Sequence, residues 1–150
     1  MQDKLVKIQK ELKAPKNQEN TFGKYKYRSC EDIVEAVKPL LHAEGLTLTL
    51  SDTVVCVGTR NYVMSQVTIS DGKTEISTLA YAREAESQKG MNEAQITGSA
   101  SSYARKYALN GLFAIDDTKD ADATNDHGHS KPREYPAPAT GEELPVINRR

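Results

Sequence analysis

Three segments with a period of two constrain the fold of this sequence more than any other feature. Apolar and polar side chains alternate over residues 46–57, 62–70 and 73–82. Because successive side chains of an extended chain point to opposite faces, this alternation is typical of strands with one buried face. A turn at 58–61 and an Asp71-Gly72 pair, a strong two-residue hairpin signal, separate the segments. The sequence therefore predicts an antiparallel three-stranded β-meander.

The apolar side chains also indicate which strand faces are buried. One face of the first strand carries Leu46, Leu48 and Leu50, and Val63, Val67 and Ile69 point inward from the second. The polar pair Ser51-Asp52 is a point where the first strand could be interrupted.

Helical patterns precede the meander. The first predicted helix is capped by Asp3 and runs to about Ala14, with an apolar stripe at Leu5, Ile8 and Leu12. Residues 15–23 then form a polar loop.

A second helix is expected after this loop. Ser29 and Asp32 have the spacing of a capping box, and Gly45 is placed to end the helix. Pro39 should kink the helix or begin a new one, because proline cannot donate the backbone hydrogen bond. The apolar face consists of Ile33, Val37, Leu40 and Leu41.

A last helix follows the meander, from near Asn92 to about Asn110, with Gln95 at a capping-box position. Its predicted buried face consists of Ile96, Ala100, Tyr103 and Tyr107. Its predicted solvent-exposed face consists of Gln95, Ser99, Ser102 and Lys106, with Arg105 on the flank. The predicted class is thus α+β: N-terminal helices, a β-β-β-α core and a C-terminal tail. The domain covers 1–115, and the Pro-containing acidic segment 116–150 is expected to be disordered.

Composition excludes several classes. The 150 residues contain no run near the roughly 20 apolar residues of a membrane span, and the N-terminus has no signal-peptide core. Cys30 and Cys56 are too few for a disulfide scaffold or zinc cluster. Charge is uneven: residues 1–28 hold eight basic and three acidic side chains, and residues 116–150 hold five and eight. This pattern favours a polyanion-binding surface followed by a solvated tail.

No residue pattern predicts an enzyme, a cofactor or a metal site. Gly72-Lys73-Thr74 ends like a phosphate-binding loop, but position 67 is Val where that motif needs Gly. His42, His127 and His129 have no ligand partner at suitable spacing. The Asp116-Asp117 region could be imagined as a nuclease metal cluster, but a solvated linker explains it better because catalytic carboxylates need rigid support.

The candidate binding residues are basic and aromatic. In an extended segment, Lys24, Lys26 and Arg28 share one side while Tyr25 and Tyr27 share the other. Cations that track phosphates beside rings that stack on bases suit single-stranded nucleic acid. A second basic edge is expected from Arg83, Lys89, Arg105 and Lys106. Core packing of the two tyrosines, and a merely solvated helix face for Arg105 and Lys106, remain open alternatives.

Several segments resemble one protein family over about residues 5–116. They are Leu12-Lys13-Ala14-Pro15-Lys16-Asn17, Phe22-Gly23-Lys24-Tyr25-Lys26-Tyr27-Arg28-Ser29, Gln95-Ile96-Thr97-Gly98-Ser99-Ala100 and Tyr103-Ala104-Arg105-Lys106-Tyr107-Ala108-Leu109. They resemble the ERF (essential recombination function) family of bacteriophage single-strand annealing proteins. Lys106 stands where the family commonly has a second Arg, which keeps the charge but loses bidentate phosphate geometry.

The resemblance implies ATP-independent annealing of complementary DNA strands by a ring or helical homo-oligomer, and a fold similar to that of the eukaryotic recombination mediator. In that distant relative, DNA-contacting basic residues lie on the helix after the meander. By position Arg105 matches one of them, while Ser101 and Ser102 stand at the others, which shifts the expected contact toward Lys24, Lys26 and Arg28.

The resemblance also implies the setting: the cytoplasm of an infected or lysogenic bacterial host. The expected partners are a phage exonuclease and a single-strand-binding protein, both recruited through the tail. The alternatives are a passive protein that coats single-stranded DNA, a small nuclease and a phage assembly protein.

Overall fold

The computed structural model describes residues 1–21 and 24–115. The predicted disordered tail, the two histidines within it and the Asp116-Asp117 region lie outside these residues. The elements in chain order are α1 (Gln2–Glu11), β1 (Gln18–Asn20), β2 (Tyr25–Tyr27), α2 (Cys30–Glu44), β3 (Thr47–Val57), β4 (Arg60–Ser70), β5 (Glu75–Arg83) and α3 (Glu93–Phe113).

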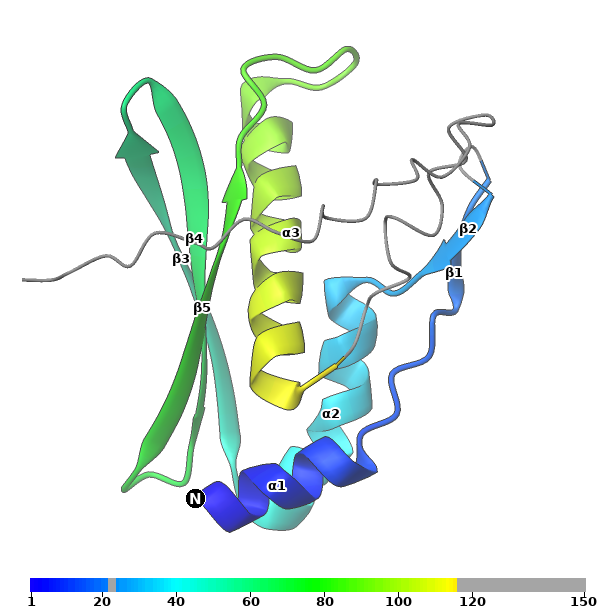
Figure 1. The fold of residues 1–150 in the computed structure, drawn as a ribbon, viewed down its shortest axis with the longest axis vertical. Coiled ribbons are helices and arrows are strands. Elements are labelled where there is room, and N and C mark those ends of the chain that lie inside the picture. The colour runs from blue at the N-terminus through cyan, green and yellow to red at the C-terminus, as the bar shows by residue number, and fades with distance from the viewer. Residues whose placement is uncertain (22–23, 116–150) are drawn as a thin grey trace, which may run out of the picture. The chain divides into compact units, whose positions relative to one another are not determined.

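The predicted meander is confirmed as an antiparallel sheet in the order β3-β4-β5 (Figure 1). β3 is continuous, and Asp52 lies opposite Ser65, so the interruption considered at Ser51-Asp52 does not occur. Val63, Val67 and Ile69 are buried as predicted. The structure therefore has the α+β class and the β-β-β-α order that the sequence predicts.

The turn between β4 and β5 differs from the prediction. The last paired residues are Ser70 and Glu75, so four residues connect the strands instead of the two-residue Asp71-Gly72 turn. The Asp71 carboxylate accepts hydrogen bonds from the backbone N–H groups of Lys73 (2.9 Å) and Thr74 (2.8 Å). These bonds from Thr74 and Lys73 lower the pKa of Asp71 to about 2. An aspartate that caps its own turn stabilises the longer loop.

The N-terminal helices follow their local signals in part. Ser29 and Asp32 form the predicted capping box, and Gly45 ends α2 in the left-handed conformation with φ +63°. Pro39 lies inside one continuous helix, so it does not begin a new one; Val37 and Leu41, on either side of the proline, are both buried in the core. Met1 is the N-cap of α1, not Asp3, and the helix ends at Glu11.

A short hairpin replaces part of the predicted loop at 15–23. β1 pairs antiparallel with β2, so that Gln18 lies opposite Tyr27 and Asn20 opposite Tyr25. Lys24 has a positive φ of 51° and lies outside the strand. The extended segment is therefore shorter than the sequence predicts.

α3 packs along one face of the sheet through its smallest side chains. Ala100, Ala104 and Ala108 are at most 5% exposed. At Gly111 an added Cβ would lie only 3.1 Å from Thr78 Cγ2 of β5, which shows how closely helix and sheet approach. The predicted burial of Tyr103 and Tyr107 is wrong, because a helix this close to a sheet has room for alanine but not for a tyrosine ring.

The larger apolar side chains pack where the three helices meet. Ile8 of α1, Ile33 and Val37 of α2, and Leu109 and Phe113 of α3 are at most 1% exposed and belong to one cluster that also contacts the sheet. Figure 1 shows α3 between the sheet and α2. This packing places the start of α2 and the β1–β2 hairpin beside the middle of α3.

Candidate nucleic-acid interface

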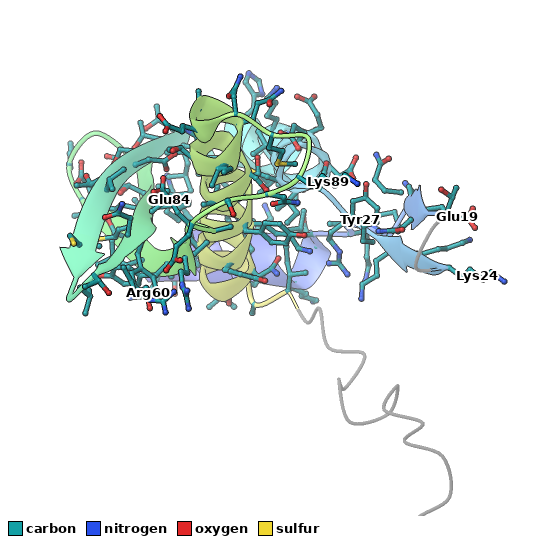
Figure 2. The ribbon with its side chains drawn as sticks, turned by 90° about the horizontal axis from the view of Figure 1, so that it is seen from above. Glu19, Lys24, Tyr27, Arg60, Glu84 and Lys89 are labelled. Atoms are coloured by element: carbon teal, nitrogen blue, oxygen red, sulfur yellow. The ribbon has the colours of Figure 1, made fainter. Side chains whose placement is uncertain are left out.

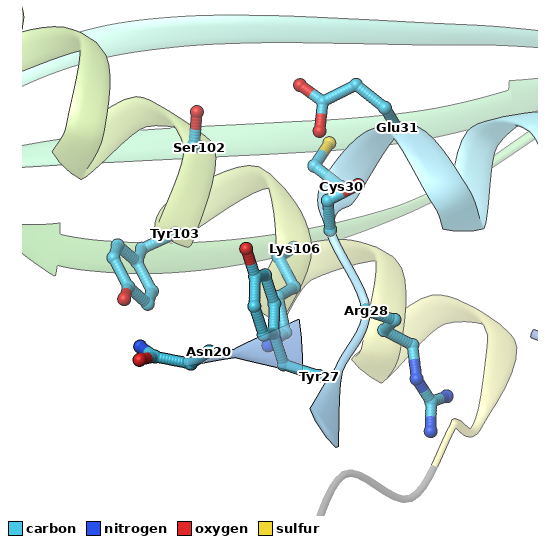
Figure 3. Close-up of a pocket in the computed structure, with 9 residues that line it drawn as sticks. Asn20, Tyr27, Arg28, Cys30, Glu31, Ser102, Tyr103 and Lys106 are labelled. Carbon is cyan, nitrogen blue, oxygen red and sulfur yellow. The ribbon is translucent and has the colours of Figure 1, made fainter. Parts of the chain in front are cut away.

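An open cleft of about 320 Å³ lies between the β1–β2 hairpin with the start of α2 on one side and α3 on the other. Figure 3 shows Tyr27 and Arg28 on the hairpin side and Tyr103 and Lys106 on α3. Glu31, at the start of α2, also lines the cleft. The cleft therefore combines two cations, two phenol rings and one carboxylate.

A second open cleft, of about 400 Å³, lies between the end of β5 and the same helix. Tyr81 and Arg83 line it from β5, and Tyr103 and Tyr107 line it from α3. Tyr103 thus borders both clefts. The two clefts make one surface that is continuous around this tyrosine.

Four tyrosines of this surface are exposed. Tyr81 and Tyr103 are each 52% exposed, Tyr107 48% and Tyr27 37%. The ring centroids of Tyr103 and Tyr107 lie 6.1 Å apart with planes tilted by 40°, within the range of paired aromatic rings. Neither ring is used to fill the core.

The predicted strip of Lys24, Lys26 and Arg28 does not form one exposed face. Lys24 and Lys26 are exposed, but Arg28 is only 8% exposed, and although it lines the first cleft its guanidinium points away from Tyr27 and Tyr103 (Figure 3). The alternation fails at both ends, because Lys24 has a left-handed backbone and β2 ends at Tyr27. Tyr25, the fifth residue predicted here, lies in β2 opposite Asn20.

The second predicted edge is divided among three places. Lys106 lines the first cleft, Arg83 lines the second, and Lys89 is exposed on the loop before α3. Figure 2 shows Lys89 on this loop, while Lys24 lies at the tip of the projecting hairpin. The fold therefore brings Tyr27, Arg28 and Lys106 together and leaves Lys24 apart from them.

Arg105 points to the sheet and pairs with Asp52 of β3. Its Nη2 lies 2.9 Å from the Asp52 carboxylate, which also accepts hydrogen bonds from the hydroxyls of Ser65 (2.7 Å) and Ser101 (2.5 Å). Partial burial raises the pKa of Asp52, but the hydrogen bonds from Arg105, Ser101 and Ser65 outweigh this effect and hold the pKa below its ordinary value. The same pairing raises the pKa of Arg105.

Sequence reasoning missed Tyr81, Tyr103 and Tyr107 as surface residues. The available signal was the alanine series at 100, 104 and 108, whose four-residue spacing marks one helix face. The helix has two possible apolar faces, one with the tyrosines and one with the alanines. The tyrosine face carries the larger apolar side chains, but only the alanine face fits closely against a sheet.

Two further classes of site are absent from the part of the chain that the structure describes. Within residues 1–21 and 24–115, no three His, Cys, Asp or Glu side chains gather so that they could hold a metal ion. No helix among the same residues is long and apolar enough to cross a membrane.

Fold and surface together define a β-β-β-α domain with an open cleft surface of cations and tyrosines. The chain belongs to the ERF superfamily, whose family model matches residues 1–141. It is 59% identical over 136 residues to a protein named "Essential recombination function protein" from Salmonella phage P22. The match covers 91% of this chain but only 63% of that relative. No solved structure matches the chain significantly.

Proposed function

We propose that this chain is a phage recombination protein that binds single-stranded DNA and promotes the annealing of complementary strands. The observation that carries the proposal is the first cleft, where Arg28 and Lys106 accompany the rings of Tyr27 and Tyr103. Phosphates need cations and bases offer flat faces to aromatic rings, so this combination suits a single strand. The family membership and the name of the phage P22 relative support a role in recombination.

Annealing needs no bond chemistry from the protein. Pairing and stacking release about 1.4 kcal/mol per base-pair step, so the barrier lies in bringing two polyanions together. Cations that neutralise one backbone reduce this repulsion, and a strand held along a surface keeps its base edges available for a partner. We accordingly propose a reaction without nucleotide, metal or other cofactor.

The DNA contacts that we propose come from several elements. Lys24 and Lys26 extend the basic surface along the hairpin, and Arg83 and Lys89 extend it on the other side of α3. Arg105 contributes differently, because its guanidinium already binds Asp52 and ties α3 to the sheet. We assign Arg105 as a positioning residue that holds the helix carrying Tyr103 and Lys106.

We also propose that the chain acts as a ring or helical homo-oligomer. One subunit presents few cations, and copies side by side multiply weak contacts through effective concentration. The sheet face away from α3 supports self-association. On this face the rows Thr49–Thr68–Ser77, Ser51–Gln66–Leu79 and Thr53–Met64–Tyr81 carry no charge, and Tyr81 and Arg83, which lie on the edge strand β5, also border the second cleft beside α3. Leu79, in the middle row, is 51% exposed.

The remaining partners belong to the same proposal. The acidic segment 116–150 would recruit a phage exonuclease and a single-strand-binding protein of the host cytoplasm, since its charge would repel DNA. The chain spans 63% of the phage P22 relative, so these partners are proposals for this chain and are not carried over from the whole relative.

The salt dependence of DNA binding tests the proposal. Affinity for a thymine oligonucleotide should fall steeply with salt, with a slope of about −0.7 per phosphate contact on logarithmic axes. The Lys26→Ala/Lys106→Ala variant should bind more weakly with a shallower slope. Lys73→Ala is the matched control. Lys73 is exposed in the turn before β5, at the end of the strand opposite Arg83, and the variant should bind like the wild type. An affinity that is indifferent to salt would contradict the proposal.

A further inference from the structure

We propose that Tyr103 and Tyr107 of α3 form a stacking platform for the bases of single-stranded DNA, with Tyr81 on the rim of the same cleft. This inference rests on the proposed DNA binding and assigns it a base-contacting site. It concerns two tyrosines that the sequence pattern placed on the buried face of the helix, beside the predicted binding residue Lys106.

The first argument is that these rings lie outside the buried core of the described residues. α3 contacts the sheet through Ala100, Ala104 and Ala108, while Tyr103 and Tyr107 are about half exposed. They lie four residues apart on the helix with ring centroids at 6.1 Å, so they form one pair of partly exposed rings. Large aromatic side chains that stay half exposed beside one another are typical of binding surfaces.

The second argument is the charge that flanks the rings. Arg83 lies in the second cleft with both tyrosines, and Lys106 lies in the first cleft with Tyr103. Of the described residues that line the second cleft, Arg83 is the only charged one. A strand that runs over α3 can therefore place phosphates at the cations on either side while its bases meet the rings between them.

Charge also decides which occupant we assign. A second copy of the chain or an apolar peptide would cover exposed tyrosines, but either would have to bury Arg83, the one charged side chain among the described residues that line the second cleft. A single strand supplies phosphates for the cations and flat bases for the rings at once. We therefore assign the platform to single-stranded DNA and treat a protein contact as an outcome of the test.

The experiment compares bases with no bases. The full chain is titrated with a thymine oligonucleotide and with an abasic oligonucleotide of the same length, whose phosphates are identical. The wild type should prefer the thymine strand, and Tyr103→Leu/Tyr107→Leu should lose about tenfold or more of that affinity while its affinity for the abasic strand stays constant. Tyr103→Phe/Tyr107→Phe keeps both rings and should bind like the wild type.

Fluorescence gives a second readout. The chain has seven Tyr and no Trp, so its emission comes from tyrosine alone. Stacking should quench this emission with the thymine strand and less with the abasic strand, and the Leu variant should lose the difference. Circular dichroism and particle size are measured alongside to check that the variants keep the fold. Because the substituted residues are about half exposed, the fold should be unaffected.

Each contrary outcome has its own meaning. A wild type that binds neither oligonucleotide overturns the proposed DNA binding and the platform with it. A wild type that binds both strands equally overturns the platform alone. A Leu variant with altered particle size and unchanged preference for thymine shows that the tyrosines contact another copy, which also overturns the platform.

Discussion

Arg105 of α3 binds both carboxylate oxygens of Asp52 on β3. The Arg105 Nε lies 3.2 Å from Oδ1 and 3.0 Å from Oδ2, and the Nη2 lies 2.9 Å from Oδ2. The pair joins residues 53 positions apart in the chain. It fixes the rotation of α3 about its axis, and therefore the direction in which Tyr103 and Lys106 point. A basic residue expected to contact DNA is thus paired with a carboxylate of the sheet.

The first prediction concerns the strength of this contact. Asp52→Asn should lower the free energy of unfolding by about 1 kcal/mol, because it removes a charge that accepts three side-chain donors. The value stays small because the Arg105 side chain is 41% exposed and water screens the pair. Urea unfolding measures it, and Glu35→Gln, which breaks an exposed pair with Lys38, should change almost nothing.

The second prediction concerns pH. Because the folded pKa of Asp52 lies below its ordinary value of 3.8, the unfolded chain binds this proton first as the pH falls. The stabilisation by Asp52 is therefore complete above the ordinary value and is lost as the pH drops through the lowered one. The stability gap between wild type and Asp52→Asn should narrow in acid. Asp71, whose pKa is about 2, is present in both chains and cancels in the difference. A gap that is constant down to strong acid would contradict the assignment.

The third prediction concerns the close approach of α3 to the sheet. Ala104 is fully buried, so Ala104→Leu should overpack the interface and lower the free energy of unfolding by about 1–3 kcal/mol. Ala94→Leu makes the same change at an exposed position of the same helix and should be nearly neutral. Thermal or urea unfolding of the two variants checks the difference, and equal stability would show that the alanine face is not packed as described.

The fourth prediction concerns self-association. Leu79→Lys places a charge in the middle of the uncharged rows of the sheet and should reduce particle mass in light scattering, because a buried unpaired charge opposes contact. Ala43→Lys adds the same charge at an exposed position of α2 and should leave the mass unchanged. An unaltered mass for Leu79→Lys would exclude this sheet face as the contact between copies.

Local signals in the sequence predicted the elements well. The capping boxes at Ser29–Asp32 and Asn92–Gln95 both form, because each is a bond between residues three apart and needs no distant partner. The period of two located all three strands of the meander, since one buried face leaves a regular trace. Strand β1 was missed because its three polar residues have no such trace and are ordered only by pairing with β2.

The candidate site was predicted less completely, because its geometry depends on contacts between distant segments. Tyr27, Arg28 and Lys106 meet in one cleft as basic and aromatic residues, which the composition of these segments suggested. The exposure of Tyr103 follows from the closeness of α3 to the sheet, and the engagement of Arg105 follows from Asp52 on β3. Neither is a property of the helix sequence alone.

The pairing rate of two complementary oligonucleotides tests the central claim most directly, measured with the purified chain in a chelator and without nucleotide. The account predicts that the wild type accelerates duplex formation, that Lys26→Ala/Lys106→Ala is slower, and that Lys73→Ala matches the wild type. A protein that binds the single strands yet leaves the pairing rate at its protein-free value would be a passive coat, and that result would contradict the account.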